Sequence, residues 1–122
     1  MNNIQIDVLP QYIPEQSDPN SGQYVYAYTI TIRNQGSHAA TLLSRHWIIT
    51  DANNKVQEVQ GMGVIGEQPT ISPQQSYAYT SGVVMETNTG MMSGTYTMQN
   101  ENGEKFEAKI PDFALAQPGA MH

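Results

Sequence analysis

The stretch YVYAYTITIR, residues 24–33, decides the fold of this chain. Bulky apolar side chains occupy every second position of it, from Tyr24 through Tyr28 to Ile32, and valine, alanine or threonine lies between them. An alternation of period two in β-branched and aromatic residues is typical of a strand that buries one face. Because a strand alone cannot satisfy its own backbone hydrogen bonds, this stretch predicts a sheet to which other segments contribute.

Shorter segments with the same alternation lie on both sides of this strand. They are Ile4–Val8, Thr41–Thr50, Val56–Val59, Ser76–Ser81, Thr95–Gln99 and Lys105–Ile110. Turn-forming residues at 51–54 and 100–103 predict two hairpins. Pro10 is expected to end the first strand, and residues 87–94 are expected to form a loop. No window of useful length shows a helical apolar stripe. The chain is therefore predicted to be all-β, an antiparallel β-sandwich of seven to eight strands like immunoglobulin and fibronectin type III domains.

Two aromatic residues favour the immunoglobulin-like arrangement. Trp47 lies on the third predicted strand, where the alternation places it on one face with Leu43 and Arg45. We expect Trp47 to be buried between the two sheets. Tyr96 precedes Met98 by two positions, as the tyrosine of a tyrosine corner precedes a core residue.

Length and composition predict one domain over residues 1–122, with a core at about 4–115 and a flexible tail at 116–122. The chain has no cysteine, which excludes disulfides, thiolate zinc sites and cysteine nucleophiles. Its 5 Lys and Arg against 11 Asp and Glu give a formal net charge of -6, so nucleic acid is not expected as a partner. The N-terminus lacks a secretion signal and no window approaches the roughly 18 apolar residues of a membrane span. We therefore expect a cytoplasmic protein without membrane insertion.

The stretch GMGVIG suggests chemistry, because Gly61, Gly63 and Gly66 have the GxGxxG spacing of phosphate-binding loops. Such loops join a strand to a helix whose N-terminal N–H groups meet the anion. Pro69 follows shortly after Gly66 and opposes a helix there. Two interpretations stay open. The sequence favours a bend between antiparallel strands that needs glycine for its backbone, and the alternative is a pyrophosphate or nucleotide site with Arg45 as the nearest cation.

The remaining polar side chains form no recognisable catalytic or metal-binding pattern. The histidines, His38, His46 and His122, lack metal-ligand spacing. The acidic residues are scattered among predicted turns and strands, without a cluster of oxygens for Mg²⁺. Ser44 has no strand-to-helix turn around it that would make it a nucleophile. The sequence therefore predicts no catalytic residue, no metal site and no cofactor, and it favours a non-enzymatic protein without deciding the point.

Several motifs resemble those of one family. They are RHWIITD at 45–51, VQGMGVIGEQP at 59–69, YTSG at 79–82 and IPDF at 110–113, with Phe106, the Gln16–Pro19 loop and the Gly94–Tyr96 turn. These motifs resemble the ApaG family over nearly the whole chain, from about Ile6 to Leu115. Gln74 departs from the pattern, because the family usually places glycine after the proline at this turn, and the local turn type is affected.

The resemblance implies a fibronectin type III-like β-sandwich and a small bacterial cytoplasmic protein, in a family whose name is linked to cobalt and magnesium efflux. It also implies an interaction module, since the domain recurs in eukaryotic F-box proteins and in a DNA-polymerase-interacting protein. Three hypotheses follow. The chain is a binding module for an unknown protein partner, or an indirect accessory to cobalt and magnesium homeostasis, or a binder or hydrolase of pyrophosphate-containing nucleotides at Gly61, Gly63, Gly66 and Arg45. A weakly bound divalent cation or nucleotide is the alternative to a protein ligand.

Overall fold

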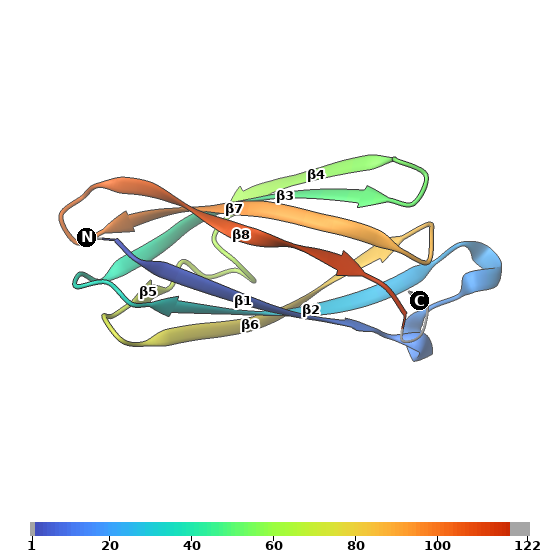
Figure 1. Ribbon diagram of the computed structural model, residues 1–122, viewed down its shortest axis with the longest axis horizontal. Helices are drawn as coiled ribbons and strands as arrows, with labels where there is room; N and C mark the ends of the chain where they lie inside the picture. The colour runs from blue at the N-terminus through green and yellow to red at the C-terminus, as the bar shows by residue number, and fades with distance from the viewer. Residues whose placement is uncertain (1, 118–122) are drawn as a thin grey trace.

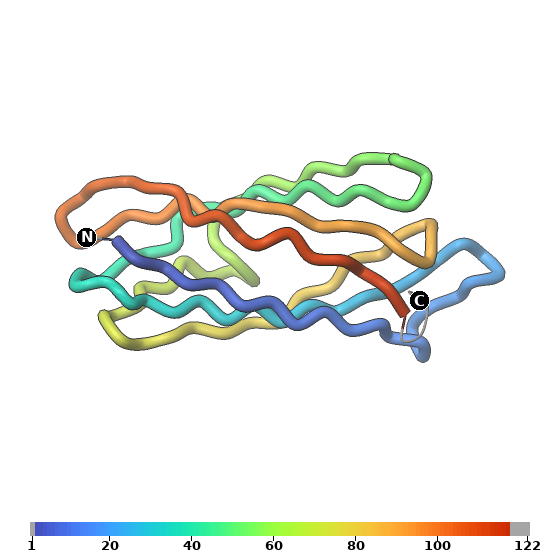
Figure 2. Tube along the Cα trace, viewed as in Figure 1, coloured from blue at the N-terminus to red at the C-terminus, as the bar shows by residue number. Residues whose placement is uncertain are grey.

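Two antiparallel β-sheets pack face to face, as the computed structural model describes for residues 2–117 (Figure 1; Figure 2). The smaller sheet has the order β1-β2-β6, with β1 at Ile4–Tyr12, β2 at Tyr24–Asn34 and β6 at Ser76–Met85. The larger sheet has the order β4-β3-β7-β8, with β4 at Val56–Met62, β3 at Ala40–Asp51, β7 at Gly90–Asn100 and β8 at Lys105–Leu115. The short β5, Thr70–Ile71, pairs with β3, and the 3-10 turns η1 (Pro14–Gln16) and η2 (Pro19–Ser21) lie between β1 and β2. The predicted all-β sandwich is confirmed.

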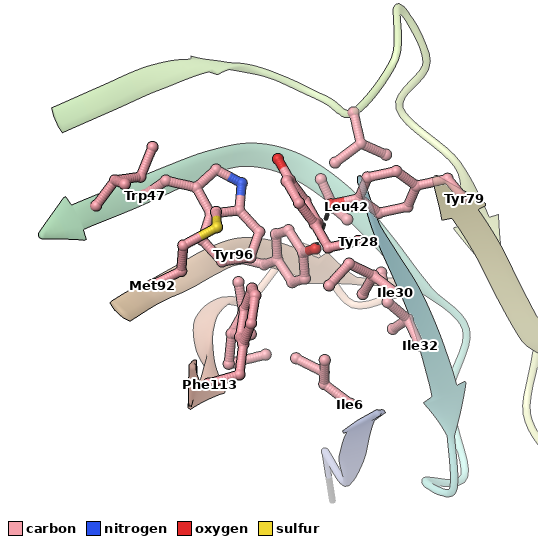
Figure 3. Close-up of a cluster of buried hydrophobic side chains, with 14 of the residues drawn as sticks. Ile6, Tyr28, Ile30, Ile32, Leu42, Trp47, Tyr79, Met92, Tyr96 and Phe113 are labelled. Carbon is pink, nitrogen blue, oxygen red and sulfur yellow. Dashed lines mark hydrogen bonds between the residues drawn. The ribbon is translucent and has the colours of Figure 1, made fainter. Parts of the chain in front are cut away.

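The strand predicted from the alternation of tyrosine and isoleucine, β2, lies at the centre of the smaller sheet and supplies its inner face. The side chains of Tyr26, Ile30 and Ile32 are completely buried. Across the sandwich, Trp47 is only 3% exposed and packs edge-on against Tyr28, with ring centroids 5.3 Å apart (Figure 3). The prediction that Trp47 is buried between the sheets is confirmed.

Tyr96 lies in the core but forms no tyrosine corner. It occupies the middle of β7, and its hydroxyl bonds to the hydroxyl of Tyr79 on β6 at 2.5 Å (Figure 3). The tyrosine-corner interpretation is wrong, because this hydroxyl joins the two sheets instead of bonding to the backbone near its own strand.

A β-bulge in β3 changes which residues face the core. The pairing with β7 shifts between Leu42 and Ser44, so Leu43 is an extra residue without a counterpart. Leu42 is completely buried as a result. A strict alternation had placed Leu43, not Leu42, on the face of Arg45 and Trp47. That prediction is wrong, since a bulge inverts the alternation locally.

Several strand boundaries also differ from the predictions. β4, β6 and β8 continue past their predicted ends to Met62, Met85 and Leu115. β1 continues through Pro10 to Tyr12, because it is an edge strand, where a proline can turn its missing N–H away from the neighbour. β7 begins at Gly90, within the predicted loop. The two predicted hairpins, β3–β4 and β7–β8, are confirmed. Residues 118–122, most of the predicted tail, lie outside the described residues.

The two lateral sides of the sandwich differ. On one side, which we call the closed side, β1 of the smaller sheet lies against β8 of the larger one. The other, which we call the open side, is bordered by β4 above and β6 below (Figure 1). Within residues 2–117, β4 has extensive contact with β3 alone. Every residue of β4 is exposed except the half-buried Gly61, so neither face of this strand is covered.

Candidate functional site

A cleft of about 360 Å³ lies on the open side, between the inner faces of the two sheets. Residues of β2, β3, β4 and β6 line it. They are Tyr28 of β2 with Arg45, Trp47, Ile49, Gln57, Val59 and the segment Ser81–Val84. The cleft exists because the larger sheet is one strand wider on this side, and no strand of residues 2–117 lies opposite β4. Its lining combines apolar side chains with one guanidinium and the hydroxyls of Tyr28 and Ser81, a composition that is common in ligand-binding sites.

Arg45 lies at the β4 end of this cleft. The strand register pairs it with Tyr96 on β7 and with Gly61 on β4. Its Nη1 donates hydrogen bonds to the carbonyl oxygens of Met62, at 3.2 Å, and Gly63, at 2.9 Å. A Cβ atom on Gly61 would lie only 2.7 Å from that same Nη1, so the guanidinium rests directly on the Gly61 backbone. Gly61 is therefore needed for the position of the arginine.

The other two glycines of the predicted loop serve a tight turn. Gly63 has a φ of 63°, and a Cβ atom there would lie 2.1 Å from the carbonyl oxygen of Glu67. Gly66, with a φ of 80°, and Ile65, with a φ of 42°, are the central residues of a two-residue hairpin turn. The adjoining Val64 is completely buried and anchors the turn in the core.

The backbone of this turn is largely hydrogen-bonded within the protein. The N–H of Gly63 donates to the carbonyl oxygen of Leu43 in the bulge of β3. Val64 and Glu67 exchange both of their N–H to C=O bonds across the turn. The turn leads to β5 and not to a helix. The structure thus brings Gly61, Gly63 and Arg45 together. However, the N–H groups of Gly63, Val64 and Glu67 donate to carbonyl oxygens of the protein, and so does Nη1 of Arg45 in both of its hydrogen bonds.

The hydroxyls of Tyr28, Tyr79 and Tyr96 lie close enough to Arg45 for its positive charge to lower their pKa values in part. Burial raises the pKa of Tyr79 to about 12, and the hydrogen bond with Tyr96 and the positive charge of Arg45 offset part of this effect. Burial also raises the pKa of Tyr96 and, less strongly, that of Tyr28. All three phenols are therefore neutral hydrogen-bonding groups at physiological pH.

The outer face of the larger sheet carries a second, shallow depression of about 470 Å³. His46 borders it, with Nε2 3.9 Å from a carboxylate oxygen of Glu58 and without a hydrogen-bond partner among the described residues. His38 bonds to Glu101 at a distant turn, and His122 lies outside the described residues. Within residues 2–117, no three His, Cys, Asp or Glu side chains lie close enough to hold a metal ion. The same residues include no helix of the length and apolarity that a membrane crossing requires.

Comparison with known proteins identifies the family. A family model described as the ApaG domain matches residues 14–100. This chain belongs to the ApaG family. Protein ApaG of Dechloromonas aromatica is 56% identical over 119 residues, which cover 98% of this chain and 94% of that protein. Protein ApaG of Shewanella oneidensis is 54% identical over 121 residues, covering 99% and 96%.

Solved structures agree with this assignment. The crystal structure described as the putative ApaA protein of Bordetella pertussis superposes with a TM-score of 0.94 at 51% identity, covering 97% of this chain and 96% of that one. The C-terminal domain of Wzt, with a TM-score of 0.55 at 10% identity, shares the fold alone. Gln74, which follows Pro73, has a φ of 67°, in the region that favours glycine.

Sequence reasoning placed Arg45 near the ApaG glycine turn, and the structure does so too. It did not predict the cleft, nor Tyr28 and Ser81, whose side chains line it. A signal was present, because Arg45 shares an alternating face with Trp47. A cation on the buried face of a strand indicates a place where that face meets solvent or a ligand.

Proposed function

We propose that this ApaG-family chain is a non-enzymatic interaction domain and that it binds a protein partner through the open side. The observation that supports this proposal is β4, a strand exposed on both faces beside a cleft that contains Arg45. An edge strand offers unpaired N–H and C=O groups to another chain. β4 carries a single charged residue, Glu58, and exposes Val56 and Met62 beside it. It therefore has little of the charge with which edge strands usually resist pairing.

The test compares two substitutions of the same kind. Val59 is 38% exposed on the inner face of β4, and Leu9 is 69% exposed on the outer face of β1. Each is replaced by glutamate, and the two variants and the parent are used to capture proteins from lysate. We expect the protein captured stoichiometrically by the parent to be lost with Val59→Glu and retained with Leu9→Glu. Equal retention by both variants would place the partner surface elsewhere.

The second candidate function is anion binding at the Gly61–Gly66 turn. The observation that favours it is the guanidinium of Arg45, which lies against Gly61 with Nη2 and Nε outside the bonds to Met62 and Gly63. The probes are labelled ATP and a dinucleoside polyphosphate, tested with the parent and with Arg45→Met. Because the N–H groups of Gly63, Val64 and Glu67 are bonded to carbonyl oxygens of the protein, we expect no saturable micromolar binding. Saturable binding by the parent that Arg45→Met removes would make the turn the functional site.

A role in cobalt and magnesium homeostasis would be indirect under this proposal, acting through the protein partner. Mg²⁺ prefers sets of oxygen ligands, and Co²⁺ also accepts imidazole nitrogen. Calorimetric titration with Co²⁺ and with Mg²⁺ tests this, and we expect binding no tighter than about millimolar, without saturation at micromolar ion. A saturable micromolar site would mean that the chain itself senses the metal.

A further inference from the structure

The two sheets differ in width, and the difference leaves one strand position unfilled. The smaller sheet ends at β6, whereas the larger sheet extends one strand farther, to β4. A strand added beside β6 would lie opposite β4 and cover its inner face. Among residues 2–117, β6 pairs with no strand besides β2. Near its start the Tyr77 hydroxyl donates to Glu67 of the glycine turn, whereas the later segment Ser81–Val84 lines the cleft and can offer its edge to a short extended peptide.

The inner side chains around this unfilled position have a defined chemistry. Trp47, Val59 and Val83 offer apolar surface. Ser81, which pairs with Tyr28 on β2, lies near the Arg45 end of the cleft. Alternate side chains of an incoming strand would point inward. One of them would meet the apolar surface beside Val83, and the next inward side chain would meet Ser81 and Arg45.

Arg45 indicates the charge of the incoming segment. Three of the five Lys and Arg residues pair with carboxylates, namely Arg33, Lys55 and Lys109. Arg45 is partly buried, and no carboxylate of residues 2–117 lies within 4.0 Å of it. This is unexpected in a chain with 11 acidic residues, since partly buried cations are usually paired. An external carboxylate would complete the site.

We propose that the open side takes up an extended peptide segment of the partner protein, which pairs with the free edge of β6 and places a carboxylate, flanked by apolar side chains, against Arg45. This inference rests on the proposed function and specifies the partner's chemistry. It is recognition by strand addition, in which main-chain hydrogen bonds provide affinity and alternate side chains provide specificity.

The test is a selection from displayed nine-residue peptides. Threonine is fixed at every outward position, lysine is fixed at both ends, and the three inward positions are random. Selection on the parent is expected to enrich Asp or Glu at one inward position with Val, Ile or Leu at its neighbours. Selection on Arg45→Met is expected to lose the acidic residue and keep the apolar ones. Absence of acidic enrichment on the parent, or its persistence on Arg45→Met, would overturn the proposal.

A matched peptide pair then measures the carboxylate. The selected peptide and its Glu→Gln counterpart are titrated by fluorescence anisotropy, and we expect the glutamate peptide to bind about tenfold more tightly. Since the chain has a net charge of -6, a non-specific electrostatic effect would favour the glutamine peptide instead. The preference should disappear in Arg45→Met and persist in Lys105→Met, which removes one positive charge from the opposite edge of the sheet. Equal affinities of the two peptides for the parent would overturn the proposal.

Val59→Glu keeps the test valid if Arg45→Met fails to fold, because Val59 is solvent-exposed. Val59→Glu should lower the affinity for the glutamate peptide by about tenfold, and Val59→Lys should not. Sedimentation decides whether a second copy fills the position instead: a dimer that Val59→Glu dissociates would overturn the peptide proposal. Failure of this inference can be distinguished from failure of the proposed function. Loss of the captured partner in Val59→Glu without any carboxylate preference would refute this inference and leave the proposed function standing.

Discussion

The two edge strands of the larger sheet, β8 and β4, have opposite surroundings. The inner side chains of β8 are covered by β1, so Ile110 and Leu115 are completely buried. On β4 the inner side chain of Val59 is 38% exposed, because the smaller sheet has no strand opposite it. Burial is worth about 25 cal/mol for each Å² of apolar surface, so β8 contributes stability that β4 does not. A strand that contributes little to stability can change its contacts on binding at little cost to the fold.

Trp47 lies between the covered core beneath β8 and the exposed region beside β4. Its side chain lines the open-side cleft but is 3% exposed, with ring centroids 5.9 Å from Phe113 and 6.3 Å from Tyr96. We therefore expect Trp47→Ala to destabilise the fold by about 3–5 kcal/mol, through lost burial and a residual cavity. Urea unfolding followed by circular dichroism measures this. A transition midpoint equal to that of the parent would mean that Trp47 belongs to the open side and is a contact residue.

The dependence of stability on alkaline pH tests whether the Tyr79 hydroxyl is buried in the core beside the open side. Burial raises its pKa from 10.0 to about 12 in the folded chain. The folded state therefore holds the phenolic proton more tightly, and this stability is complete below pH 10 and is lost between pH 10 and about 12. The separation corresponds to about 2–3 kcal/mol.

The measurement is the free energy of unfolding at pH 8 and at pH 11. The control is Tyr79→Phe, in which the loss between the two pH values should be smaller, since Tyr96 is then the main buried phenol at this place. An equal loss in parent and variant would show that water from the cleft reaches the Tyr79 hydroxyl.

The glycine turn beside β4 provides the third comparison. Gly63→Ala should cost more than about 1 kcal/mol, because the position combines a positive φ with a backbone clash at Glu67. Gly66→Ala is the matched control: its φ is also positive, but a Cβ atom there meets nothing within 4 Å. Thermal melts of both variants should rank Gly63→Ala as the less stable. The reverse order would contradict a structural role for Gly63 and strengthen the anion-binding hypothesis.

The sequence predicted the parts of the fold that depend on local pattern. The alternation in β2, the burial of Trp47 and the hairpin turns all follow from residues close together in the chain. The bulge at Leu43 was not predictable, because it forms where the glycine turn donates a hydrogen bond to the Leu43 carbonyl oxygen from about 20 residues away. The open side could not be predicted from the sequence either. A strand with alternating residues looks the same whether or not another sheet covers it, so exposure of β4 follows only from the number of strands in each sheet.

The same isosteric substitution at two valines tests whether the inner face of β4 is exposed. Val59 on β4 is 38% exposed, and Val64 in the adjoining turn is completely buried. Threonine has nearly the shape of valine, but its hydroxyl needs a hydrogen-bond partner when buried. Val64→Thr should therefore cost about 1–3 kcal/mol, whereas Val59→Thr should stay within about 0.5 kcal/mol, because water still reaches the hydroxyl. Urea unfolding of the two variants measures the difference. Equal costs would mean that the inner face of β4 is covered in solution, and sedimentation of the purified chain then tells whether a second copy covers it.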